Sequence, residues 1–117
     1  MSDTFIIKRR DNLPVLRATL FTDQAQTVPV DLTNASFVMV KVGKLNQAPI
    51  LDKTMTILTP RTTGRVEYQF SVDDTNQFPD EYLMEFEVNW NGGNVSTYPK
   101  QGYKTFRVVA DLDQEIE

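Results

Sequence analysis

The sequence predicts one all-β domain, a sandwich or a small barrel of about seven to nine short strands. Apolar and polar residues alternate along residues 81–91, and the same alternation returns along residues 65–72. Segments rich in Gly, Pro, Asn and Asp interrupt the chain about every ten residues, which is the spacing of turns in such folds. A length of 117 residues suits one compact domain.

The first half of the chain predicts four strands. Residues 5–8 and 50–58 are short candidates bounded by turn residues. In residues 16–20 three apolar side chains alternate with two polar ones, which predicts a strand with one solvated face. Residues 36–42 carry an unbroken apolar run, which predicts a central strand buried on both faces.

The second half contains the clearest strands. Residues 65–72 and 81–91 alternate strictly, and residues 94–98 and 103–110 complete the set. Gly92 and Gly93 predict a β-hairpin turn with positive φ. The buried faces of the two clearest strands are predicted to consist of Val66, Tyr68, Phe70, Val72, Tyr82, Met84, Phe86, Val88 and Trp90.

Two further turns are predicted around these strands. Gly64 is expected to occupy a turn with positive φ before the strand that contains Val66. A single helical turn is expected near residues 73–77, where Asp73 or Asp74 could cap it.

Composition argues against an enzyme. The chain has no cysteine and no histidine, so it lacks thiolate ligands, cysteine nucleophiles and the commonest general base. We therefore expect no catalytic residue, no metal site and no cofactor. The net charge of -4 disfavours nucleic-acid binding, and no apolar stretch is long enough to predict a membrane span.

One group of acids is a candidate for acid/base catalysis or for calcium binding. Neither reading is favoured, because neighbours on one loop and one strand face do not predict a cleft, and the spacing of a calcium-binding loop is missing. We expect these side chains to cap a turn and to cover a solvated strand face. They are Asp73, Asp74, Asp80, Glu81, Glu85 and Glu87.

Lys8, Arg9 and Arg10 form a basic run at the end of the first predicted strand. They are the candidate contact with a protein partner, and a solvated strand end is the alternative. No aromatic residue is interleaved with them, so stacking on a nucleic-acid base is not favoured.

Three aromatic residues suggest a platform for carbohydrate. Trp90, Tyr98 and Tyr103 could stack on sugar rings if they were exposed. The alternation of residues 81–91 places Trp90 on the inward face, which favours a position in the core or at its rim with the indole N–H satisfied.

Several separated pieces of the chain, taken in order, resemble the N-terminal domain of the phage baseplate upper protein family. The resemblance covers roughly residues 5–110, and Arg10, Asn34 and Asp80 stand where that family commonly has glycine. The pieces are Lys8, Asp11 and Pro14 before Leu16, Ala18 and Leu20; Val30, Asp31, Leu32, Thr33, Asn34 and Ala35 before Phe37; Gly64, Val66 and Tyr68; Asp74; Tyr82, Glu85, Phe86 and Val88; Gly92 or Gly93; and Thr97, Pro99 and Tyr103.

The resemblance implies an immunoglobulin-like antiparallel β-sandwich with a structural role in the tail of a phage or prophage. Such domains attach the upper protein to the core of the baseplate, so the expected partners are other tail proteins and not nucleic acid or membrane. A threefold or sixfold assembly with several copies of the chain, made in the host cytoplasm and located in the virion, follows from the same resemblance. The alternative function is a carbohydrate-binding module for host cell-wall polysaccharide.

The resemblance and the charge pattern also suggest where the domain ends. Residues 1–110 are expected to form the sandwich, and residues 111–117 an acidic tail or the start of a linker. Whether the chain stands alone or belongs to a longer protein stays open.

Overall fold

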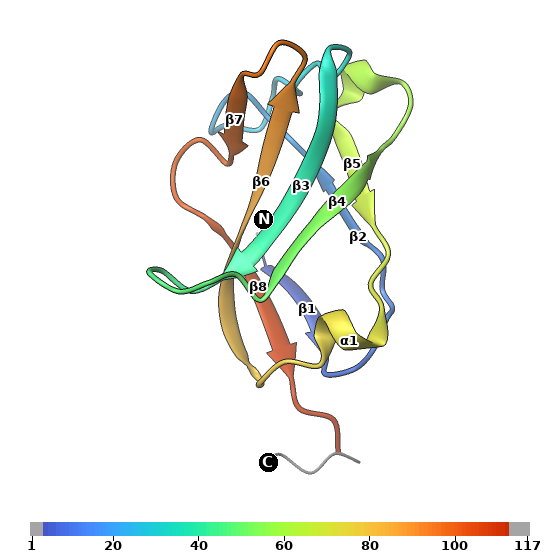
Figure 1. The fold of residues 1–117 in the computed structure, drawn as a ribbon, viewed down its shortest axis with the longest axis vertical. Coiled ribbons are helices and arrows are strands. Elements are labelled where there is room, and N and C mark those ends of the chain that lie inside the picture. The colour runs from blue at the N-terminus through green and yellow to red at the C-terminus, as the bar shows by residue number, and fades with distance from the viewer. Residues whose placement is uncertain (1–3, 113–117) are drawn as a thin grey trace.

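The computed structural model describes residues 4–112 and confirms an all-β fold (Figure 1). A short helix, α1 (Val72–Thr75), and a 3-10 turn at Arg61–Thr63 interrupt the strands. No helix in this part of the chain has the length and apolar character that crossing a membrane requires. The strands are β1 (Thr4–Lys8), β2 (Leu16–Thr19), β3 (Ala35–Gly43), β4 (Leu51–Ile57), β5 (Arg65–Tyr68), β6 (Asp80–Trp90), β7 (Val95–Tyr98) and β8 (Lys104–Val109).

The strands form two layers that share β4. The first layer has the order β1-β8-β6-β3-β4, with β7 beside the far end of β6, and the second contains β4, β5 and β2. The first residues of β4 pair with β3, whereas Thr56 and Ile57 pair with β5, so β4 passes from one layer to the other. Figure 1 shows β2 and β5 behind β4, as the second layer of a sandwich.

One strand pair departs from the predicted antiparallel pattern. β1 pairs with β8 in parallel, from Thr4 opposite Thr105 to Lys8 opposite Val109. The first and last strands are far apart in sequence, so no short hairpin constrains their direction. All the other strand pairs within residues 4–112 are antiparallel.

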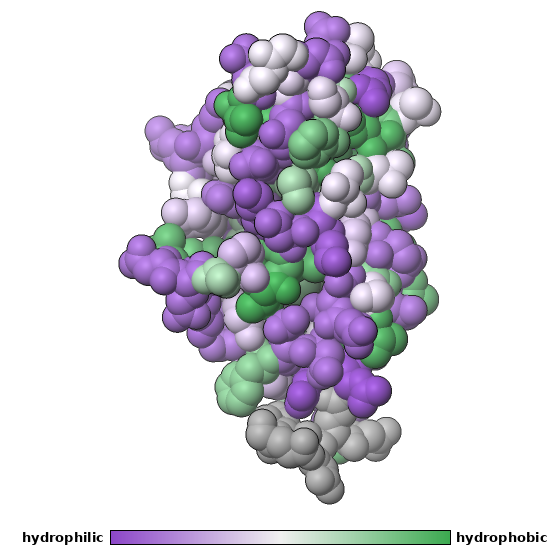
Figure 2. Space-filling view, in the orientation of Figure 1, coloured by the Kyte–Doolittle hydropathy of each residue, from purple (hydrophilic) through white to green (hydrophobic). Residues whose placement is uncertain are grey.

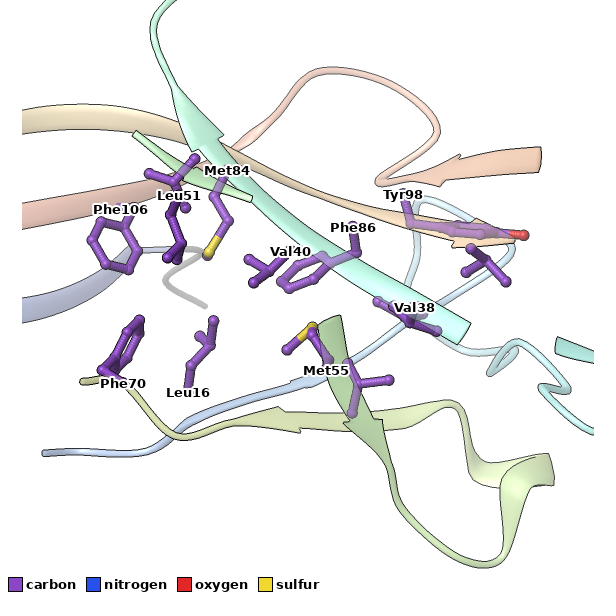
Figure 3. Packing of buried hydrophobic residues seen from close by; sticks show 14 of the residues in the cluster. Leu16, Val38, Val40, Leu51, Met55, Phe70, Met84, Phe86, Tyr98 and Phe106 are labelled. Atoms are coloured by element: carbon purple, nitrogen blue, oxygen red, sulfur yellow. The ribbon is translucent and has the colours of Figure 1, made fainter. Parts of the chain in front are cut away.

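The core lies between the two layers, and Figure 3 shows its side chains facing one another. In the register of β3 with β6, Val40 lies opposite Phe86, and both are fully buried. Leu16 of β2, and Met55 at the point where β4 passes between the layers, lie across the core from Val40 and Phe86. The inward face predicted for residues 82–88 is confirmed.

The prediction that residues 36–42 are buried on both faces is wrong. Val38, Val40 and Val42 are buried, but Phe37 is 39% exposed. β3 is nevertheless central in its sheet, as predicted, with β6 on one side and β4 on the other. The outer face of the sheet carries no further layer in the described chain, so the apolar residues between the valines lie on the surface.

The strand predicted along residues 65–72 is too long. Strand pairing ends at Tyr68, and Val72 begins α1 with 41% of its surface exposed. The reason is a capping box, in which the Ser71 hydroxyl accepts from the Asp74 amide and the Asp74 carboxylate accepts from the Ser71 amide. The predicted helical turn is present, but Ser71 is its N-cap.

A tyrosine at the start of β6 fastens this corner of the sandwich. The Tyr82 hydroxyl donates to the carbonyl oxygen of Phe78, four residues upstream. A tyrosine in this position, after the turn that joins the two sheets, is a recurrent feature of immunoglobulin-like domains. The hydrogen bond fixes the turn that leads from the second layer into β6.

The glycine turns are confirmed. Gly64 has φ of 68°, and Gly92 and Gly93 have φ of 90° and 95° in the hairpin between β6 and β7. A Cβ atom on Gly64 would lie 2.8 Å from the carbonyl oxygen of Leu20 and 2.9 Å from that of Val30. Gly64 therefore has both conformational and steric reasons to be glycine.

Candidate functional site

The predicted basic run forms the turn that follows β1. The Asp11 amide donates to the Lys8 carbonyl oxygen at 3.1 Å, which closes the turn. The Arg9 amide donates to Val109 at the end of β8, and the Arg9 Nε–H donates to the side-chain oxygen of Asn76. Lys8 and Arg10 are exposed, whereas Arg9 is half-buried. The structure thus holds the run in place, and its contact with a partner stays a prediction.

Arg10 adopts the backbone conformation of the glycine that it replaces in the family resemblance. Its φ is 70°, and its amide donates to the carbonyl oxygen of Thr75 at 3.2 Å. Asn34 and Asp80 are not among the described non-glycine residues with positive φ. The first turn therefore keeps a left-handed residue, while the other two replacements follow ordinary backbone.

The acids that were candidates for catalysis do not converge on one place. Asp80 pairs with Lys44, Glu81 with Arg107, and Glu87 with Lys41 at 3.3 Å. Within residues 4–112 no group of three or more Asp or Glu side chains could hold a metal ion. Glu81 and Glu87 make cross-strand ion pairs on the outer face of the first sheet, whereas Asp80 pairs with Lys44 in the loop that follows β3.

Two of these acids lie in contacts that shift a pKa. Burial and the hydrogen bond to Asp74 raise the pKa of the Tyr68 hydroxyl, which donates to Asp74 at 2.7 Å. The hydrogen bond from Lys44 lowers the pKa of Asp80 and raises that of Lys44. In both places the partner stabilises the protonation state found at neutral pH.

The three aromatic residues lie in different environments. Trp90 is half-buried at the rim of the core, and its indole N–H donates to the Ser96 hydroxyl at 2.8 Å. Tyr98 is 6% exposed and accepts a hydrogen bond from the same hydroxyl. Tyr103 is 47% exposed. Of the three rings, Tyr103 is the most exposed.

Tyr103 borders a cavity of about 370 Å³ between two loops. One wall is the hairpin of residues 21–29 and the other is the loop of residues 99–103. The Gln24 side-chain amide donates to the Gln101 side-chain oxygen and joins the two loops at one point. Sequence reasoning missed both glutamines, because their loops become neighbours only through the sheet pairing.

A second cavity of about 450 Å³ runs along β2, and we call it the β2 groove. It is lined by β2 itself and by Met84 and Phe86 of the opposite layer, and it shares Thr19, Phe21 and Gln26 with the cavity described above. The two cavities therefore lie along the same open side of the sandwich. No local pattern predicts this groove, since it depends on which strand edges remain unpaired.

The outer face of the first sheet is mostly hydrophilic, with separate apolar areas (Figure 2). Phe37 is 39% exposed and Val95 is 55% exposed, and the register places both beside Asn89 of β6. Lys41 and Glu87 form an ion pair further along the same face.

Comparison with known proteins gives no family assignment. No family model matches the chain, and no curated protein sequence matches it. Among solved structures, the chain is similar to the crystal structure of CopC from Methylosinus trichosporium OB3b, with a TM-score of 0.47 and 7% identity. The match covers 96% of this chain and 87% of that one.

Proposed function

We propose that this chain is a structural module of a phage tail baseplate, which attaches to other tail proteins and helps to assemble the host-adsorption apparatus. The support is the ordered set of residues that resembles the baseplate upper protein family. In the structure, many of these residues hold turns and corners of the sandwich and do not form a chemical site.

Three of these positions illustrate that support. The Asp31 carboxylate accepts from the Thr33 amide at 3.0 Å and fixes the turn before β3. Gly64 packs against the backbone of Leu20 and Val30. The Tyr68 hydroxyl ties β5 to α1 through Asp74. A pattern spread over such positions describes a scaffold, and a scaffold is what an assembly module requires.

Labelling of purified particles tests this proposal. Antibodies raised against the chain are expected to label one end of the tail in gradient-purified virions, as seen by electron microscopy. Mass spectrometry of the same particles is expected to find the chain in a fixed ratio to other tail proteins. The proposal is wrong if the antibody labels host cytosol while virions carry neither label nor peptide.

The alternative function, a carbohydrate-binding module for host cell-wall polysaccharide, has one observation in its favour. The exposed Tyr103 ring lies beside Gln24 and Gln101, whose amides can donate to and accept from sugar hydroxyls. Titration with purified cell-wall polysaccharide tests it. Tyr103→Ala should abolish binding, whereas Tyr103→Phe, which keeps the ring, should retain it. Equal binding by the wild type and Tyr103→Ala would remove this function.

A further inference from the structure

We infer that β2 accepts an extended segment of a partner polypeptide as an additional strand of the second sheet. The inference concerns the edge of β2 and the β2 groove, and it stands whether or not the assembly is a phage baseplate. It goes beyond the proposed function because it names a surface and the chemistry of what binds there.

The backbone of β2 directs hydrogen-bonding groups away from β5. In an antiparallel pair, successive residues point their N–H and C=O groups to opposite sides. The Leu20 amide donates to the Gly64 carbonyl oxygen at 2.8 Å, in continuation of the β2–β5 register. Ala18 has the same parity and therefore points toward β5. Arg17 and Thr19 point their N–H and C=O groups away from β5, toward the β2 groove that both residues line.

The same direction continues at Phe21. Phe21 forms an isolated bridge with Pro29, and the hydrogen bonds on either side of this bridge belong to Leu20 and Thr22. The N–H and C=O of Phe21 consequently point away from Pro29. With the two residues above, they form a row of donors and acceptors that repeats about every 6.7 Å along the edge. An extended peptide backbone has groups with the same repeat.

The place beside β2 is the place of a strand in related architectures. In immunoglobulin constant-type domains, a first strand completes a four-stranded sheet by pairing with the second strand. Here β1 pairs with β8 in the opposite layer, and the second layer contains β4, β5 and β2. The β2 groove lies where that first strand would run.

The floor of the β2 groove is apolar. Met84 and Phe86 of β6 and Leu16 of β2 line it. A strand seated beside β2 would direct alternate side chains onto this floor and the others toward solvent. The occupant is therefore a segment with apolar residues at every second position.

The charge beside β2 favours an acidic segment. The cavity on the outer side of β2 is lined by two cations, Arg17 and Arg65, and one acid, Glu67. Arg17 donates its Nε–H to Glu67 at 2.8 Å, and its guanidinium carries further N–H groups. An acidic residue on the solvent-facing side of the incoming strand would pair with them. A second copy would instead bring the same cations to the interface, so charge favours a different polypeptide.

A strand supplied within the same chain tests the inference. Thr4 and Phe5 line the β2 groove, so a designed strand can be joined ahead of residue 1 through a flexible Gly/Ser linker. The strand has about seven residues that alternate Val with Thr or Glu, and the linker holds it at high effective concentration. Hydrogen exchange followed by NMR should show at least about tenfold slower exchange at the amides of Arg17, Thr19 and Phe21. A Gly/Ser extension of equal length is the control and should change none of these rates.

Proline variants show whether the edge itself makes the contact. Thr19→Pro removes an N–H that points into the β2 groove, so it should fold and lose the added protection at Arg17 and Phe21. Thr19→Ala keeps the N–H and should retain the protection. Ala18→Pro removes an N–H that pairs with β5 and should unfold the domain.

Three outcomes would overturn the inference. The designed strand could leave the three amides as exposed as the Gly/Ser extension does. Thr19→Pro could keep the protection, which would mean that the contact does not use the edge. The unextended chain could also protect the same amides by forming a dimer, as measured by light scattering, which would make a second copy the occupant.

Discussion

β6 and β2 both alternate apolar and polar residues, yet they hold very different places in the sandwich. β6 has β3 on one side along almost its whole length, and β8 and then β7 on the other. β2 has four residues and pairs with β5 alone among the described strands. Alternation shows which face of a strand is buried, but it does not show how many neighbours the strand has. The first property determines stability, and the second determines where another chain can add.

The largest expected effect is a difference between the two strands in the unfolding free energy that a substitution removes. Phe86 is fully buried at the centre of β6, so Phe86→Ala should cost about 3–5 kcal/mol of unfolding free energy. Thr19→Ala on β2 is the matched comparison and should cost no more than about 0.5 kcal/mol. Urea denaturation measures both. A loss below about 1 kcal/mol for Phe86→Ala would mean that the inward face of β6 has been misassigned.

The next effect concerns Gly64, which packs against Leu20, the residue that follows β2. Gly64→Ala would place a Cβ atom within 3 Å of backbone oxygens of Leu20 and Val30, in addition to the strain of φ at 68°. The expected loss is about 3 kcal/mol or more. Gly92→Ala is the control, because its φ is 90° but no atom lies within 4 Å of the added Cβ, and it should cost about 1–2 kcal/mol. Equal losses for the two variants would contradict the steric argument.

A smaller effect tests the hydrogen bond of the Tyr82 hydroxyl at the start of β6. Tyr82→Phe removes the hydroxyl that donates to the Phe78 carbonyl oxygen and should cost about 1–2 kcal/mol. The ring stays buried in the variant, so thermal unfolding should remain cooperative. Tyr103→Phe, in which the ring is exposed, is the control and should leave the melting temperature unchanged. An unchanged melting temperature for Tyr82→Phe would mean that the corner does not contribute to stability.

Substitution of Arg10, in the turn that leads from β1 toward β2, should raise the free energy of unfolding. Arg10 has φ of 70°, which glycine adopts without strain. Arg10→Gly should therefore stabilise the domain by about 0.5–1 kcal/mol, after the larger entropy of glycine in the unfolded chain is subtracted. Arg10→Ala keeps the strain and should give no such gain, as chemical denaturation would show. A loss of stability in Arg10→Gly would mean that the arginine side chain holds the turn.

The smallest effect is a pH dependence at the start of β6. Lys44 lowers the pKa of Asp80 below its ordinary value of 3.8 in the folded state. The stabilisation is therefore complete above that ordinary value and is lost as the pH falls through the lowered pKa. Asp80→Asn should remove this part of the acid dependence, measured by thermal unfolding between pH 2 and 6 (about the range of carboxylate titration). Identical acid profiles for the wild type and Asp80→Asn would contradict the assignment.

Local features were predictable where local chemistry decides them. The burial of Phe86 and the left-handed turn at Gly64 follow from alternation and from turn composition. The strand predicted through Val72 was too long, because the Ser71 and Asp74 capping box competes with strand pairing. The alternation of apolar and polar residues contains no signal of that capping box. The β2 groove could not be predicted, since it depends on β1 pairing with β8 about one hundred residues later in the chain.

The parallel pair of β1 and β8 has a mechanical consequence. The N-terminal end of β1 and the C-terminal end of β8 lie at opposite ends of one ladder of five residue pairs. A force that pulls these two ends apart acts along the strands and loads all the hydrogen bonds of the ladder together. In an antiparallel pair pulled from adjacent ends, the hydrogen bonds would break one after another. The β1–β8 pair should therefore resist tension along its strands, and single-molecule stretching in that direction should require a higher force than pulling across the strands.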